Sequence, residues 1–165
     1  MRLLMRLMMQ LFMQLLMQLS SAPSALLLLG CIVAGQASAL DFKSVGATPA
    51  VLYDAPSARG KKVFVAPRNM PVEVILTYGE WSKVRDASGD LAWVESKALV
   101  PKRFVVVKAA SARIHSGAED ASPVAFSAEK GVLLEMVEPV STGWVKVRHR
   151  DGQGGFVKAN EVWGE

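Results

Sequence analysis

Hydrophobic and polar positions alternate in short runs along the chain after residue 40, a pattern typical of β-strands with one buried face. Runs rich in valine, isoleucine and aromatic residues are separated by glycine, proline, serine and aspartate, which favour turns. No stretch after Leu40 keeps a helical period for three turns, although 95–98 and 158–161 could each form a single turn. We therefore predict an all-β protein, with strands in the first half of this region at 50–53, 62–66, 71–77, 81–85 and 91–94.

The pattern occurs twice, since residues 47–100 align with residues 109–163. The offset is 62 where Phe64 meets Phe126, and one inserted residue raises it to 63 where Trp81-Ser82-Lys83-Val84-Arg85 meets Trp144-Val145-Lys146-Val147-Arg148. Strands this short cannot form a sandwich of two full sheets, whereas they can close into a small barrel without exposed sheet edges. We expect two domains at 40–103 and 104–165, each a five-stranded barrel, that meet near residue 103.

These motifs resemble the bacterial SH3-like domain family. The second copy carries the small-residue loop 112–117, the basic-glycine pair before Val132, the W-x-K-V motif, the glycine hairpin and the aromatic-valine pair at 156–157. The first copy is looser, with Ala92 in place of the glycine before the aromatic residue. The resemblance implies two tandem SH3-like barrels and a binding or targeting role outside the cytoplasm, often beside cell-wall enzymes. It does not specify the ligand, because one fold serves many ligands.

Residues 1–39 have the features of a signal peptide. Arg2 and Arg6 are their only charged side chains, and an apolar run at 25–35 is followed by Gln36-Ala37-Ser38-Ala39. Small residues at these last positions predict cleavage between Ala39 and Leu40, and the apolar run is too short to span a bilayer. A competing lipoprotein box ends at Cys31, but the stretch that follows is too apolar for a typical tether, so we favour ordinary cleavage. We expect an exported protein, periplasmic or extracellular, without a transmembrane helix in its mature part.

Export changes the charge and the cysteine content of the working protein. Of 19 basic residues, Arg2 and Arg6 lie in the signal peptide, so 17 remain against 15 acids and the net charge falls to +2. A charge this small gives no strong field for nucleic acid, which we exclude as a partner. Cleavage also removes Cys31, the single cysteine, and with it any thiolate nucleophile, metal ligand or disulfide.

Catalytic chemistry finds little support in the mature sequence. His115 and His149 are the two histidines, they occupy non-equivalent positions in the two copies, and we expect both to be exposed loop residues. Neither belongs to a recognisable nucleophile–base arrangement, and the spacing of ligands needed for zinc is missing. We therefore expect a protein that is not an enzyme and that has no metal or cofactor.

Binding chemistry is better supported, because strand alternation places aromatic and basic side chains together. With the valines of each W-x-K-V motif facing the core, Trp81 and Trp144 share the outer face with the basic side chains Lys83, Lys146 and Arg148. In eukaryotic relatives of the fold such a tryptophan lines a peptide groove, which makes Tyr53 its neighbour in the first copy and His115 the counterpart in the second. Each tryptophan could instead only cover the end of its barrel. We expect binding of peptidoglycan or wall-derived peptides, or alternatively a protein-interaction adaptor that docks an envelope protein.

Overall fold

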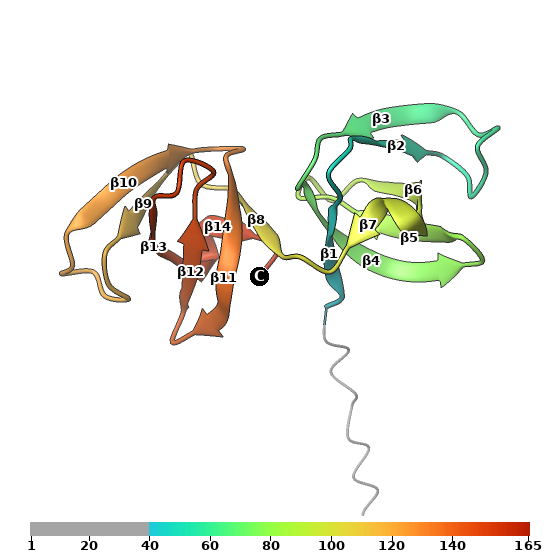
Figure 1. Cartoon of the computed structure of the whole chain (residues 1–165). Helices are drawn as coiled ribbons and strands as arrows, with labels where there is room; N and C mark the ends of the chain where they lie inside the picture. Colours follow the sequence, from blue (N-terminus) through green and yellow to red (C-terminus); the bar gives the residue numbers. More distant parts are fainter. Residues whose placement is uncertain (1–39) are drawn as a thin grey trace, which may run out of the picture. The chain divides into compact units, whose positions relative to one another are not determined.

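The computed structural model describes residues 40–165, and the predicted signal peptide with its cleavage site after Ala39 lies outside them. These residues form two repeats of antiparallel strands, one after the other along the chain (Figure 1). The first repeat contains β1 (Phe42–Val45), β2 (Ala50–Tyr53), β3 (Lys62–Ala66), β4 (Pro71–Tyr78), β5 (Trp81–Arg85), β6 (Leu91–Glu95), the 3-10 helix η1 (Ser96–Ala98) and β7 (Leu99–Val100). The second contains β8 (Phe104–Val107), β9 (Ser111–His115), β10 (Val124–Glu129), β11 (Leu133–Ser141), β12 (Trp144–Arg148), β13 (Gly154–Lys158), η2 (Ala159–Glu161) and β14 (Val162–Trp163). The all-β prediction is confirmed.

Each repeat builds one antiparallel sheet, and the two sheets have the same strand order. The first runs β3-β2-β6-β5-β4-β1-β7 and the second β10-β9-β13-β12-β11-β8-β14. The predicted count of five strands per copy is corrected to seven, because a strand before the five and one after them also join the sheet. In the first repeat these are β1 and β7, which pair with Val45 opposite Leu99. Strand β7 has only two residues, which are too few to show an alternating pattern in the sequence.

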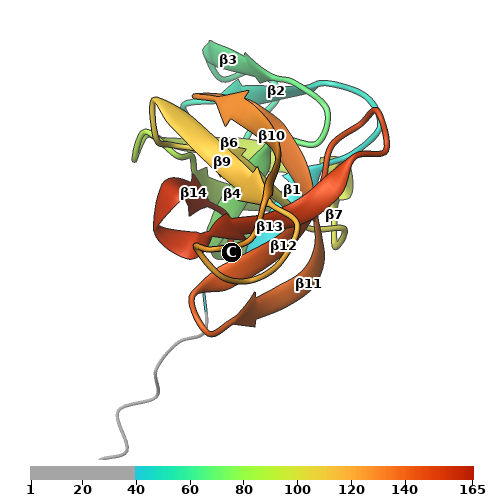
Figure 2. The same ribbon diagram turned by 90° about the vertical axis from the view of Figure 1, so that its left-hand side faces the viewer.

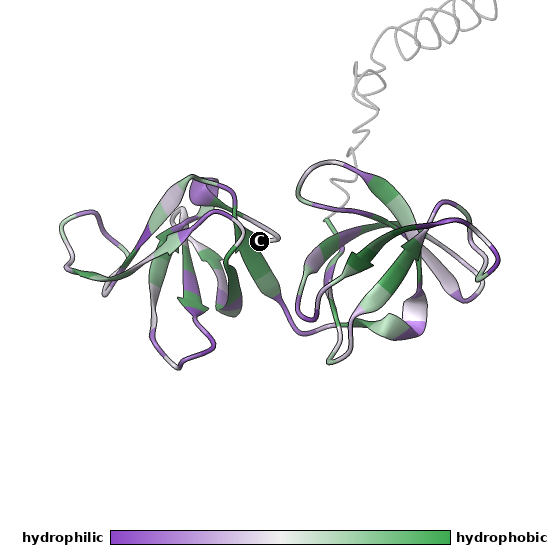
Figure 3. Cartoon of the chain, turned by 90° about the horizontal axis from the view of Figure 1, so that it is seen from above, coloured by the Kyte–Doolittle hydropathy of each residue, from purple (hydrophilic) through white to green (hydrophobic). Residues whose placement is uncertain are grey.

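The buried face of each sheet closes over its own apolar cluster. Val84 and Val147 are each 1 % exposed and Val145 is fully buried, as the alternation along the two W-x-K-V motifs predicts. The first cluster consists of Val45, Ala50, Leu52, Ala66, Val72, Val84, Ala92 and Val94. The second consists of Val105, Val107, Ala112, Ile114, Ala128, Leu134, Val145, Val147, Val157 and Val162. Hydrophobic segments follow the strands and hydrophilic ones the connecting loops (Figure 3).

The residue inserted between the two copies lies in the long β11–β12 hairpin of the second repeat (Figure 2). In the first repeat, Leu76 lies opposite Lys83 and Tyr78 opposite Trp81, so both strands advance by the same number of residues. In the second repeat Glu138 lies opposite Lys146 and Ser141 opposite Trp144, with a register shift between the two pairs. The insertion is therefore a local irregularity of β11, and the residues that follow it keep their places in the sheet.

One polar pair distinguishes the first core from the second. Ser82 is 2 % exposed, and its Oγ lies 2.8 Å from the Oγ of Ser96, so that each hydroxyl has a partner. At the offset of 63 the same two positions hold Val145 and Ala159 in the second repeat. The two copies thus fill one structural position by different means, a hydrogen bond in the first and apolar contact in the second.

Candidate functional site

The side chain of Trp81 lies at the first position of β5 and packs against Tyr53, the last residue of β2. The two rings meet edge to face, with centroids 5.5 Å apart and an interplanar angle of 87°. Both side chains are half-buried, so each keeps part of its surface in contact with solvent. The contact brings together two residues that the sequence analysis assigned to one site.

A depression of about 430 Å³ lies beside Trp81, and we call it the Trp81 site. A second depression of about 340 Å³ extends it past Tyr53 and shares Glu95 and Lys97 with it. The combined surface offers an aromatic wall, two carboxylates, several hydroxyls and an ammonium group. The Trp81 site is lined by Ala58, Glu80, Trp81, Glu95, Ser96 and Lys97.

The loop at residues 54–61, which contributes Ala58 to this wall, is held by its own hydrogen bonds. The backbone N–H of Lys61 donates to Asp54 Oδ1 over 2.9 Å, and the N–H of Asp54 donates to the carbonyl oxygen of Lys61 over 3.1 Å. The backbone of Gly60 lies close to Asp54 and Ser57. A Cβ at this position would lie 2.9 Å from Asp54 Oδ1 and 3.0 Å from the Ser57 carbonyl oxygen. Glycine is needed here for close packing, and the loop is built around that approach.

The predicted cationic residues lie on the outer face of the sheet, but each already has a partner there. Lys83 Nζ lies 5.9 Å from the ring centroid of Trp93. Lys146 Nζ lies 2.6 Å from Glu138 Oε1, and Arg148 Nη2 donates to Glu135 Oε1 over 3.1 Å. The cations therefore lie on the predicted face, but they contact residues of neighbouring strands rather than the rings of Trp81 and Trp144.

In the second repeat the counterpart of the Trp81–Tyr53 contact joins Trp144 and His115. Their ring centroids are 5.4 Å apart at 77°. His115 is only 5 % exposed and its Nδ1 lies 2.9 Å from the carbonyl oxygen of Ser122. The expectation of an exposed loop histidine is therefore wrong for His115. It ends β9, where the ring fills the space under the following loop and finds a backbone partner.

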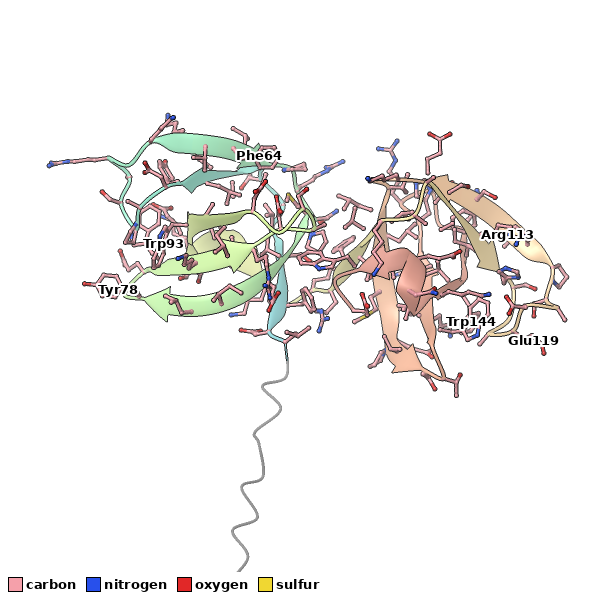
Figure 4. The ribbon with its side chains drawn as sticks, turned by 180° about the vertical axis from the view of Figure 1, so that it is seen from behind. Phe64, Tyr78, Trp93, Arg113, Glu119 and Trp144 are labelled. Carbon is pink, nitrogen blue, oxygen red and sulfur yellow. The ribbon has the colours of Figure 1, made fainter. Side chains whose placement is uncertain are left out.

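The outer face of Trp144 is covered by a charged side chain. Lys158 Nζ lies 5.6 Å from the indole centroid and forms an ion pair with Asp120 Oδ1, which belongs to the loop after β9. The hydrogen bond from Lys158 lowers the pKa of the Asp120 carboxyl below its ordinary value, and the charges of His115 and Arg113 act in the same direction. We call Trp144, His115, Asp120 and Lys158 the Trp144 site. Figure 4 labels Trp144, Arg113 and, in that loop, Glu119.

Sequence reasoning found the aromatic residues of both sites but missed the charged residues around them. Glu80 and Glu95 in the first repeat, and Asp120 and Lys158 in the second, were not singled out. A signal was present, because the alignment at an offset of 63 sets Glu95 opposite Lys158, a reversal of charge beside the same tryptophan.

Residues 40–165 contain no group of three or more His, Cys, Asp or Glu side chains placed to hold a metal ion. Over the same residues no helix has the length and hydropathy needed to cross a bilayer.

None of the curated proteins compared with this chain matches its sequence. Among solved structures, the chain is similar to NlpC2 from Trichomonas vaginalis, with 11% identity, a TM-score of 0.36, and coverage of 77% of this chain and 49% of that one. NlpC1 from the same organism gives 9% identity, a TM-score of 0.36, and coverage of 77% and 46%. The chain spans about half the length of these two proteins.

The family comparison covers most of the chain that the structure describes. The bacterial SH3 domain matches at residues 46–101 and again at 108–164, one match in each repeat of the fold. Both matches include the tryptophan that opens the central strand and the 3-10 helix that closes the sheet. The chain therefore belongs to the bacterial SH3 domain family, of which it carries two tandem copies.

Proposed function

We propose that the protein is an exported binding module of the cell envelope that recognises peptidoglycan or wall-derived peptides. The observation that carries the proposal is the open aromatic corner formed by Trp81 and Tyr53, with the hollow of about 430 Å³ beside it. A half-buried aromatic wall beside carboxylate, hydroxyl and ammonium groups suits a sugar face or a peptide backbone, since both combine apolar and polar edges. The resemblance to SH3-like modules that accompany cell-wall enzymes supports the same assignment.

The proposed binding surface consists of the outer faces of both repeats. It comprises Trp81, Tyr53 and Lys83 in the first repeat and Trp144, Lys146 and Arg148 in the second. Two weak contacts on one chain act together on a polymer, because the second contact becomes intramolecular once the first has formed. The proposal includes no catalytic step.

Co-sedimentation with purified cell-wall sacculi tests the proposal. The parent protein should sediment with sacculi, and a variant carrying both Trp81→Ala and Trp144→Ala should remain in the supernatant. Circular dichroism of the variant must match the parent, so that loss of binding is not loss of fold. The matched control is Phe64→Ala, because Phe64 is an aromatic residue of β3, 48 % exposed and outside both sites. A folded double variant that sediments like the parent would refute the proposed surface.

A second candidate, a protein-interaction adaptor, is favoured by a different surface. Strand β3 ends the first sheet and exposes Val63, Phe64 and Val65 by 50 %, 48 % and 59 %. A sheet edge with free backbone groups and exposed apolar side chains can add a strand from a partner. Under this alternative the parent would not bind sacculi, and Phe64→Ala would remove a crosslinked envelope protein that both tryptophan variants retain.

A further inference from the structure

The two tryptophan sites occupy equivalent places in the fold, which allows a comparison position by position. The loop after β2 and the loop after β9 contain the same two backbone hydrogen bonds at an offset of 62. These are Asp54 N–H to Lys61 O with Gly60 N–H to Ser57 O, and Ser116 N–H to Pro123 O with Ser122 N–H to Glu119 O. Ala58 in the first loop is therefore the structural equivalent of Asp120 in the second.

The 3-10 helices that form the other wall of the two sites are also equivalent. Ser96 N–H donates to the Glu80 carbonyl oxygen over 2.8 Å, and Ala159 N–H donates to the Gly143 carbonyl oxygen over 2.9 Å. The offset of 63 then makes Glu95 the equivalent of Lys158, the residue before each 3-10 helix. Around one aromatic pair, the first repeat thus holds Ala58, Glu80 and Glu95 where the second holds Asp120, Gly143 and Lys158.

In the second repeat the counterparts of Ala58 and Glu95 contact each other beside Trp144. Asp120 and Lys158 form an ion pair that connects the loop to the end of β13, and the ammonium group lies over the indole ring. A ligand that approaches the outer face of Trp144 must first break this pair. A ligand with a positive charge would also be repelled by Lys158.

In the first repeat the same bridge cannot form, because Ala58 has no carboxylate and Glu95 carries the opposite charge to Lys158. Glu95 instead binds an ammonium group supplied by the chain itself, with Lys97 Nζ 3.0 Å from its Oε2. The Lys97 side chain is 82 % exposed, so water screens this pair, as it also screens the Asp120–Lys158 pair, in which the Asp120 side chain is 74 % exposed. What distinguishes the second pair is that its ammonium group lies over the indole ring. The hydrogen bond to Glu95 raises the pKa of Lys97, and the charges of Glu95 and Glu80 raise it further.

We infer that the two sites are not equivalent: the Trp81 site binds a peptide group that carries a protonated amine, whereas Asp120 and Lys158 hold the Trp144 site closed. The inference rests on the proposed function and narrows it, because it assigns recognition of the peptide to the Trp81 surface alone and names the chemical class that this surface selects. An ammonium group beside Trp81 gains a cation–π contact with the indole and attraction to Glu80 and Glu95. It takes the place that Lys97 occupies in the free protein, and Lys97 is free to turn into solvent.

Titration followed by NMR separates the two sites, because each tryptophan has its own indole N–H signal. The probe is the tripeptide Ala–γ-Glu–Lys, and the control is the same tripeptide acetylated on both amino groups. The free peptide should shift the Trp81 signal saturably and leave the Trp144 signal in place. Acetylation should weaken binding by about tenfold, the scale of a lost cation–π contact and ion pair. Equal shifts at both tryptophans, equal affinity for both peptides, or no shift at Trp81 would each overturn the inference.

Reciprocal substitutions test the closing pair itself. Ala58→Asp with Glu95→Lys should install the bridge in the first repeat and abolish the response of Trp81. Asp120→Ala with Lys158→Glu should remove it from the second and make Trp144 respond. Glu80→Gln with Glu95→Gln is the conservative counterpart, which keeps shape and removes charge, and should weaken the free peptide several-fold. If Trp144 stays silent in the opened variant while its spectrum remains folded, the closing role is wrong.

Sedimentation of the parent and of the two single tryptophan variants tests the proposed function and the inference separately. A parent protein that does not sediment with sacculi refutes the proposed function, whatever the peptides do. If sacculi bind and Trp144→Ala weakens sedimentation as much as Trp81→Ala, the function stands and the inference fails.

Discussion

Trp81 meets Tyr53 edge to face at 5.5 Å, and the tryptophan of the second repeat meets His115 in nearly the same geometry. The repetition shows that the contact belongs to the fold, since it survives a change of the second ring from phenol to imidazole. What differs is burial, because His115 is 5 % exposed and Tyr53 is only half-buried. The first repeat therefore offers two aromatic surfaces to a ligand, whereas in the second His115 is buried and Lys158 lies over the Trp144 ring.

The Tyr53–Trp81 contact should contribute measurably to stability. In a double-mutant cycle with Tyr53→Leu and Trp81→Leu, we expect a coupling free energy of about 0.5–1.5 kcal/mol, the range for edge-to-face aromatic pairs. Urea denaturation of the four proteins gives this value. Coupling near zero would mean that the rings only lie side by side.

Val147 is a core residue, and a charge at its position should not be tolerated. It is 1 % exposed and lies among the apolar side chains of the second cluster. Val147→Asp buries a carboxylate without a partner, for which we expect a loss of about 3–5 kcal/mol in the free energy of unfolding. Thermal unfolding by circular dichroism measures the effect, and Val106→Asp, at a half-buried position of β8 in the same repeat, is the milder comparison. A Val147→Asp protein that melts like the parent would contradict the assigned face.

The Ser82–Ser96 hydrogen bond should be replaceable only as a pair. Ser96→Ala leaves the buried Ser82 hydroxyl unpaired and should cost about 1–3 kcal/mol. Ser82→Val with Ser96→Ala copies the second repeat, where the positions hold valine and alanine, and should recover most of that loss. Comparing denaturant midpoints of the single and double variants decides between these outcomes. A double variant less stable than Ser96→Ala would show that the first core lacks room for the larger side chain.

The Asp120–Lys158 pair should make the stability of the second repeat depend on pH. The hydrogen bond from Lys158 holds the pKa of the Asp120 carboxyl below its ordinary value of 3.8, so its contribution is fully present above that value. It is lost as the pH falls through the lower pKa of the folded protein. The difference in unfolding free energy between parent and Asp120→Asn should be constant at neutral pH and vanish in strong acid. A difference that grows on acidification would contradict this sign.

Export should remove residues 1–39. Intact mass spectrometry of the protein from its host should give a chain that begins at Leu40, because Ala37 and Ala39 occupy the positions that signal peptidase inspects. A lipid-modified chain beginning at Cys31, or a chain that keeps its first residues, would refute the prediction.

The strands could be predicted closely because turn residues and alternation mark them on both sides. The predicted 50–53, 62–66 and 81–85 agree with β2, β3 and β5, and both single turns appear as 3-10 helices. The pair β1 and β7 could not be found in this way, because β7 is held by pairing across the sheet and has no local pattern of its own. Trp81, Tyr53 and Trp144 were identifiable from the repeat. The charged residues that differentiate their sites depend on which loop folds over which ring, a relation set by tertiary structure.

The unlike cores of the two repeats affect which sheet each closing segment can dock on as the duplicated chain folds. Two sheets with one strand order give each closing segment two places to dock, a common route to swapped or misassembled products. If η2 docked on the first sheet, Ala159 would face Ser82 and leave a buried hydroxyl without a partner, at a cost of about 1–3 kcal/mol. In the reverse exchange Ser96 would face Val145 and lose its own partner. Each exchange would leave a serine hydroxyl without its partner, so the divergence at these two positions disfavours the wrong assembly.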